Sequence, residues 1–254
     1  MRGATRHANL MTSPLVTLIA TRAQDTLVDE AGIIIKIQEG GPALFLRSAF
    51  DAMKVAYDFQ SPEIMDVEIL ITPKDEFGRM KHPVPALSID GRSISTPALV
   101  VSTILDEVSL DALSSYTGKL FLDVQGYVRD GKEFGKKKEW EPTNAVSESI
   151  FAIKATEQEL KYIPAELVAC LRRQEAQKKK LLLVTKGEKG CDVYSCGKEY
   201  SVVPSRAVKA KDTIGAGDTF FGSFIAEFLK TGNPELSAQV AQKTVEKFLQ
   251  QKEG

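Results

Sequence analysis

The stretch Lys-Asp-Thr-Ile-Gly-Ala-Gly-Asp-Thr-Phe-Phe, residues 211–221, carries the most information in the chain. It predicts a loop that turns into a helix, because two glycines permit a tight turn and apolar residues then recur at helical spacing. Asp212 and Thr213 have short oxygen side chains that can accept from the free N–H groups of a first helical turn. We therefore expect a helix that begins near residue 215, with an apolar face formed by Phe220, Phe221, Phe224, Ile225, Phe228 and Leu229.

The N–H groups of Gly215, Ala216 and Gly217 are predicted to converge at the positive end of this helix, which is a ready site for an anion. Asp218 follows in the first helical turn, so a carboxylate lies beside that site. An anion cradle with a neighbouring base is what phosphoryl transfer to a hydroxyl requires. The helix N-terminus should favour the ionised form of Asp218, which would make it a weak base. A glycine-rich helix cap with no catalytic role is the alternative interpretation.

This segment closely resembles the D-T-x-G-A-G-D motif of the ribokinase-like (PfkB) carbohydrate kinase family. The resemblance extends over most of residues 14–249, with a deletion in the second quarter, so we expect a shortened member. It implies an α/β fold, a Rossmann-like three-layer αβα sandwich with a small or reduced β lid. It also implies transfer of the γ-phosphate of ATP, with Mg²⁺, to a hydroxyl of a sugar or polyol. In that mechanism Asp218 accepts the hydroxyl proton, and the three amides stabilise the transferred group.

The composition is that of an ordinary globular protein, with 254 residues and a net charge of −1. This charge predicts neither a nucleic-acid nor a membrane partner, and no apolar run approaches the ~20 residues that span a bilayer. Three scattered cysteines and two histidines do not predict a zinc site and are typical of a reducing, cytoplasmic compartment. The polar, basic residues 1–13 are expected to be a disordered leader before a kinase domain over residues 14–254.

Two segments near the N-terminus resemble the family's acceptor-binding elements. Asp25 follows the predicted first strand, residues 14–20, at the offset where the family grips substrate hydroxyls; a solvated loop carboxylate is the alternative. A lid is predicted from parts of residues 25–40 and 66–86, although a solvated surface loop fits residues 70–79 equally well. A reduced lid would leave an unpaired sheet edge, so a homodimer is one option.

The pair Gly40-Gly41, followed by Pro42, predicts the end of a strand and the first turn of a helix. It resembles the family's G-G-x-x-x-N substrate motif, in which the glycines offer backbone groups to a hydroxyl. Phe45 stands in place of the asparagine, which predicts an acceptor pocket with fewer hydrogen bonds. A simple turn is the alternative for the glycine pair.

From residue 96 onward, strands alternate with helices: a strand is predicted at residues 98–102, a helix from Glu107 to Tyr116 and a strand at residues 119–124. This alternation predicts parallel βαβ units. Arg129 follows the predicted strand at residues 119–124, at the functional edge of such a sheet, where it either meets an anionic group or lies exposed. The turn at residues 185–190 resembles the family's T-x-G-x-x-G element, whose threonine and backbone meet the nucleotide; a plain hairpin turn is the alternative. The predicted nucleotide-binding residues are Thr185, Gly187, Gly190 and Thr213.

Thr156 and Glu159 have the spacing of a capping box at the start of a helix. They also resemble the family's N-x-x-E motif, whose glutamate helps to hold magnesium, usually through water. Magnesium prefers carboxylates, waters and phosphates, so a single glutamate suffices as an outer ligand. Both roles can coexist at Glu159.

The sequence is also compatible with two other functions. One is a nucleoside or vitamin kinase on the same fold, which a purine-sized acceptor pocket would favour. The other is a non-catalytic nucleotide-binding homologue, supported by Phe45 and the shortened second quarter. Asp218 argues against the second function, because a protein that only binds nucleotide does not need a base.

Overall fold

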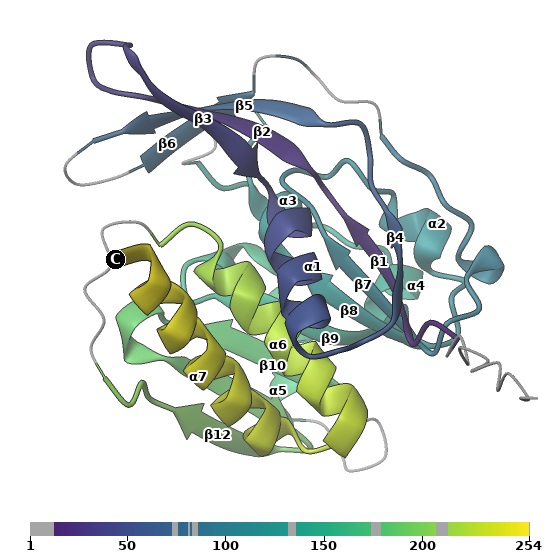
Figure 1. The fold of residues 1–254 in the computed structure, drawn as a ribbon. Helices are drawn as coiled ribbons and strands as arrows, with labels where there is room; N and C mark the ends of the chain where they lie inside the picture. Colours follow the sequence, from purple (N-terminus) through teal and green to yellow (C-terminus); the bar gives the residue numbers. More distant parts are fainter. Residues whose placement is uncertain are drawn as a thin grey trace, which may run out of the picture.

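The fold is organised around an eight-stranded sheet with the order β12-β11-β10-β9-β8-β7-β1-β4 (Figure 1). The computed structural model describes residues 13–72, 76–80, 82, 86–131, 136–173, 179–206 and 213–253. Six neighbouring strands, from β10 to β4, are parallel, while β11 and β12 are antiparallel at one edge. The strands are β1 Val16–Ala20, β4 Tyr57–Gln60, β7 Ala98–Ser102, β8 Lys119–Asp123, β9 Ile150–Thr156, β10 Leu181–Thr185, β11 Cys191–Ser195 and β12 Lys198–Val202.

The central strands are buried on both faces, which explains their continuous apolar sequences. One face is covered by α1 Pro42–Ala52, α6 Ala216–Thr231 and α7 Pro234–Glu253. Phe50 of α1 and the phenylalanines of α6 form a core there with Phe121 of β8. The other face is covered by shorter elements: α2 Leu110–Leu113, α3 Gln125–Val128, α4 Asn144–Ser149 and α5 Ala165–Arg173. The predicted three-layer αβα sandwich is therefore confirmed.

A second, four-stranded sheet with the order β3-β2-β5-β6 stands beyond the edge of the main sheet (Figure 1). It consists of β2 Ala23–Val28, β3 Ile34–Gly40, β5 Met65–Ile71 and β6 Glu76–Met80. The residue ranges predicted for the lid fall on this sheet, apart from residues 73–75, 81 and 83–85, which lie outside the described residues. A role as a lid stays a prediction, as do the division into leader and kinase domain and the homodimer.

The helix starts predicted at Pro42 and near residue 215 are found at α1 and α6. Gly215, which has no side chain, occupies the N-cap position of α6 with φ 84°. The side chain of Thr213 is exposed, while its carbonyl accepts from the N–H of Ala216 (3.1 Å). Asp212 and the first 12 residues of the predicted leader lie outside the described residues.

Two other expectations were wrong in extent. The helix predicted from Glu107 to Tyr116 is reduced to α2, because the Glu107 carboxylate accepts from the N–H groups of Ile104 and Leu105 and so holds a loop instead. The helix predicted to open at Thr156 is a single 3₁₀ turn, Glu159–Tyr162, after β9 continues to Thr156. Among the described helices, none combines the length and apolar character needed to cross a bilayer.

Candidate active site

A cavity of about 750 Å³ lies at the carboxyl ends of the parallel strands, between the start of α6 and the second sheet. This is the edge where α/β sheets of this kind bind ligands. The cavity brings together most of the residues that the sequence nominated: Asp25, Gly41, Arg129, Thr185, Gly187, Gly190, Thr213, Gly215, Ala216, Gly217 and Asp218. Gly40 and Glu159 do not line it.

Asp218 lies in the first turn of α6, half-buried on the cavity wall. Beside it, the N–H of Gly217 has no hydrogen-bond partner among the described residues, so this donor can serve a ligand. The N–H of Ala216 is engaged with the Thr213 carbonyl, which closes the turn before the helix. The predicted trio of amides is therefore unequal, because the Ala216 N–H is engaged, whereas those of Gly215 and Gly217 have no partner among the described residues.

Burial raises the pKa of Asp218 to about 7, and the nearby carboxylate of Asp123 adds to this effect. The positive charges of Lys154 and Arg129 act in the opposite direction without cancelling it. The expectation that Asp218 is a weak base is thus wrong, because burial raises its pKa. A carboxylate with this proton affinity is well matched to general-base chemistry near neutral pH.

Asp25 lies on strand β2 and not in a solvated loop, and only 4% of its surface is exposed. Burial raises its pKa to about 6. A Cβ built on Gly40 would overlap this carboxylate, and one built on Gly41, at φ 80°, would lie 2.6 Å from the Thr21 carbonyl oxygen. Gly40 thus leaves room for the Asp25 side chain at the cavity wall, and Gly41 makes the turn that leads into α1.

Phe45 lines the cavity one turn into α1, and its ring packs against the Cα of Gly215. It also contacts Phe248 of α7 edge to face, with ring centroids 5.8 Å apart. Lys252 lies over both rings and its Nζ donates to the Ile214 carbonyl oxygen (2.8 Å). Phe45 and the last turn of α7 therefore pack against the predicted anion-binding loop, residues 213–217, which we call the anion loop.

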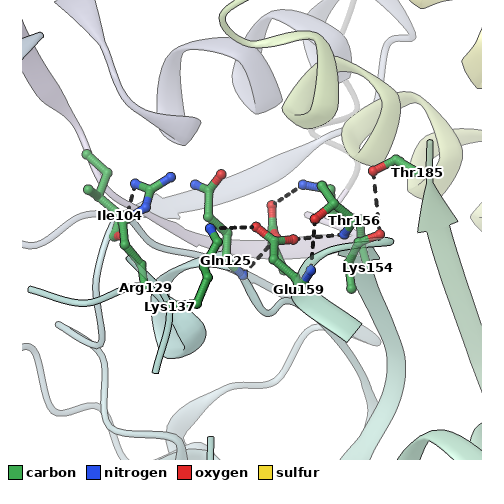
Figure 2. A network of polar contacts seen from close by, with 10 residues as sticks. Ile104, Gln125, Arg129, Lys137, Lys154, Thr156, Glu159 and Thr185 are labelled. Atoms are coloured by element: carbon green, nitrogen blue, oxygen red, sulfur yellow. Dashed lines mark hydrogen bonds and ion pairs between the residues drawn. The ribbon is translucent and has the colours of Figure 1, made fainter. Parts of the chain in front are cut away.

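A buried polar network lies beneath the cavity (Figure 2). The Nζ of Lys154 on β9 lies 2.9 Å from Oδ2 of Asp123 on β8, in a fully buried ion pair. Asp123 also accepts from the Ser102 hydroxyl (3.3 Å) and from the N–H of Gln125 (3.1 Å). Lys154 is not among the site residues predicted above, although it is the one charge in the otherwise apolar segment Ile-Phe-Ala-Ile-Lys-Ala, residues 150–155.

Glu159 forms the reciprocal hydrogen bonds of the predicted capping box. Its carboxylate accepts from the N–H of Thr156 (2.8 Å), and its own N–H donates to the Thr156 hydroxyl (3.2 Å). Lys137 lies 3.5 Å from the other carboxylate oxygen (Figure 2). Burial opposes ionisation, but Lys154, the Thr156 N–H and Lys137 outweigh it and hold the pKa of Glu159 below its usual value. Glu159 is thus an anion behind the cavity wall, suited to a water-mediated contact with a cation and not to direct ligation.

The turn after β10 is both a hairpin and a part of the cavity. The Lys186 N–H donates to the Gly190 carbonyl (2.8 Å), and β10 and β11 pair on either side. Gly190 has φ 88°, and a Cβ there would overlap the Val202 carbonyl, so the close approach of β12 requires glycine. Thr185 and Gly187 line the same cavity as Thr213.

Arg129 lines the cavity and is not an exposed arginine. Its Nη1 donates to the Ile104 carbonyl oxygen (3.2 Å), as Figure 2 shows. Burial lowers the pKa of Arg129 below its usual value, although the charges of Glu159, Asp123 and Asp218 favour its ionised form. Among the described residues, no cluster of three or more His, Cys, Asp or Glu side chains could hold a metal alone, so a cation here would need ligands from water or from a bound phosphate.

Residues 139–253 match the family described as pfkB family carbohydrate kinase. A probable fructokinase-5 of Arabidopsis thaliana is 39% identical over 105 residues, which are 37% of this chain and 32% of that protein. A fructokinase of Klebsiella pneumoniae is 38% identical over 93 residues, 35% of this chain and 30% of that one. The matches thus span about a third of these relatives.

The fold similarity extends over nearly the whole chain. A sulfate complex of a pyrophosphate-dependent kinase in the ribokinase family has a TM-score of 0.69 at 16% identity, covering 91% of this chain and 95% of that one. Arabidopsis thaliana ribokinase complexed with ribose and ATP has a TM-score of 0.64 at 15% identity, covering 94% and 99%. The C-terminal part of the chain thus matches the pfkB carbohydrate kinase family, and the fold of nearly the whole chain is that of solved ribokinase-family structures.

Proposed function

We propose that this protein is a kinase that transfers the γ-phosphate of ATP to a hydroxyl of a sugar or polyol. The observation that carries the proposal is the position of Asp218, in one cavity with the buried Asp25 and next to the Gly217 N–H, which has no partner in the part of the chain that the structure describes. Phosphoryl transfer to an alcohol uses a base, a hydrogen-bond donor to the phosphate anion and a carboxylate that binds the acceptor hydroxyls. The family match and the fructokinase relatives support the same reaction.

In this proposal Asp218 accepts the proton of the acceptor hydroxyl as its oxygen bonds to the γ-phosphorus. The bond from that phosphorus to the β,γ-bridging oxygen breaks, and ADP leaves with the bonding electrons. The N–H groups of Gly217 and Gly215 stabilise negative charge on the transferred group, while the N–H of Ala216 stays bonded to the Thr213 carbonyl. Magnesium, when bound with the donor, would offset phosphate charge; Glu159 would hold it only through water, because its carboxylate stands behind the cavity wall.

The donor would lie along the wall formed by Thr185, Gly187, Gly190 and Thr213, which is lined further on by apolar residues of α7. The acceptor would lie toward the second sheet, where Asp25 meets Val67 and Ile69, with Arg129 at the side. Gly41 offers backbone groups there, while Gly40 acts by making room for Asp25. One carboxylate among apolar residues suits a small polyhydroxylated acceptor that is held by few hydrogen bonds.

The test is a transfer assay with the full chain, magnesium and labelled ATP across sugars, polyols and nucleosides, with fructose first because of the relatives' names. Asp218→Asn measured alongside gives the background. We expect at least one sugar or polyol to be phosphorylated by the wild-type protein and not by Asp218→Asn. Transfer to nucleosides alone would show that the acceptor is a nucleoside and not a sugar or polyol. ATP binding without transfer to any acceptor would favour the non-catalytic homologue and contradict the proposal.

A further inference from the structure

We propose that Lys154 binds the terminal phosphate of the donor, whose oxygen would lie between the lysine ammonium and the N–H of Gly217. This inference rests on the proposed function, because it concerns the donor end of the same cavity. It adds a full positive charge to a phosphate site that would otherwise consist of backbone amides and a helix N-terminus.

The geometry places the ammonium directly beside the start of α6. A Cβ built on Gly217 would lie 3.2 Å from Nζ of Lys154, so the ammonium and the Gly217 backbone are immediate neighbours. Lys154 reaches this point from the middle of the main sheet, since β9 pairs with both β8 and β10. Of the described lysines, it is the one that lines the cavity.

The ammonium is too deeply buried to be a solvated surface charge, because only 3% of the residue is exposed. A buried charge is costly unless anions surround it. Asp123 supplies one, held in place by Ser102 and Gln125, but an ammonium carries three N–H donors and Asp123 accepts one of them. A phosphate oxygen entering the cavity would provide a second anionic acceptor for a group that already faces it.

Two neighbouring lysines, unlike Lys154, do not face the cavity. Lys186, at the end of β10, pairs with Asp192 and does not line the cavity. Lys137 pairs with Glu159 behind the wall. Lys154 is therefore the lysine whose position, burial and remaining donors all fit a phosphate beside Gly217.

A single substitution such as Lys154→Met would leave Asp123 buried without its partner, which endangers folding. The informative variant is therefore Lys154→Met/Asp123→Asn, which removes both charges of the pair. Asp123→Asn alone keeps the ammonium, and Lys138→Met, at an exposed pair with Asp106, controls for the loss of one positive charge. Thermal unfolding of each variant establishes that it is folded.

The measurement is the affinity of each folded protein for ATP and for ADP, by calorimetry with magnesium. We expect the double variant to bind ATP about tenfold or more weakly while its ADP affinity changes less than threefold, since charge-assisted hydrogen bonds to phosphate are strong. Asp123→Asn should bind ATP at least as tightly as the wild type, and Lys138→Met should match it.

Unchanged ATP affinity in the folded double variant would overturn the inference, as would equal losses for ATP and ADP, which indicate a structural role. A wild-type protein that binds neither nucleotide would overturn the inference and the proposed donor together. A wild-type protein that binds ATP but phosphorylates no acceptor would defeat the proposed function alone, and the ATP and ADP comparison would still decide the role of Lys154.

Discussion

Gly40 leaves the space that Asp25 occupies, because a Cβ at residue 40 would overlap the Asp25 carboxylate. The two residues are diagonal neighbours on the paired strands β2 and β3, because Asp25 lies opposite Gln38 and Gly40 lies opposite Ala23. The absence of a side chain on one strand thus fixes the position of a buried carboxylate on the next. This relationship links a glycine outside the cavity to acceptor binding within it.

Gly40→Ala should therefore displace the Asp25 carboxylate and raise the KM for the acceptor about tenfold or more, while the KM for ATP stays within about threefold, since the donor wall is untouched. Gly131→Ala is the matched control, because its Cβ would lie 3.7 Å from Leu105, an ordinary contact. Steady-state kinetics on both variants make the comparison. Equal acceptor KM values in the two variants would show that Asp25 is not positioned through Gly40.

The pH dependence of the reaction follows from the raised pKa of Asp218, about 7, which burial causes. The base is active when ionised, so kcat/KM should rise about tenfold per pH unit below this pKa and level off above it. A profile from pH 5 to 9 measures this, with enzyme stability checked at each pH. A profile that is flat between pH 5 and 8 would show that Asp218 is not the titrating base.

The same pKa shift predicts an effect on stability. The folded state holds the Asp218 proton more tightly than the unfolded chain, whose pKa is near 3.8, so this stabilisation is present at low pH and is lost as the pH rises through about 7. Asp218→Asn removes the cost of a buried charge, and its free energy of unfolding should exceed that of the wild type by about 1–3 kcal/mol at pH 8, with a smaller difference at pH 5. Urea unfolding at both pH values tests this, with Asp66→Asn, an exposed carboxylate of β5, as control. A difference that does not grow with pH would contradict the burial argument.

The end of α7 should affect the anion loop, because the Lys252 ammonium donates to the Ile214 carbonyl and covers Phe45 and Phe248. Lys252→Met keeps most of the apolar contact but loses the hydrogen bond, so we expect the KM for ATP to rise about threefold to tenfold, with the acceptor KM little changed. Lys247→Met, an exposed lysine of the same helix, is the control. Identical kinetics for both variants would show that this contact does not support the loop.

The sequence predicted the parts of the site that depend on local structure. Residues 215–218 at a helix start, the turn at 185–190 and the strand ends of a parallel sheet follow from glycine placement and apolar periodicity, so they could be located without tertiary contacts. The fold class followed from the same patterns together with the family resemblance.

What the sequence could not provide depends on residues that are distant along the chain. Lys154 and Asp123 meet across two strands although 31 positions separate them. The pKa of Asp218 depends on how deeply the assembled fold buries it, and helix-dipole reasoning alone gave the wrong direction. The helix predicted to begin at Glu107 does not form there, because the Glu107 carboxylate accepts from nearby loop N–H groups and from the hydroxyl of Thr21, which is 86 positions away.

The central claim is that the carboxylate at residue 218 serves as the base for phosphoryl transfer to an alcohol. The most direct measurement is single-turnover transfer of labelled phosphate from bound ATP to the best acceptor, for the wild type and for Asp218→Asn, with ATP affinity measured on the same samples. We expect the rate to fall by about two to four orders of magnitude while ATP affinity changes less than threefold. A near wild-type transfer rate in Asp218→Asn would contradict the claim.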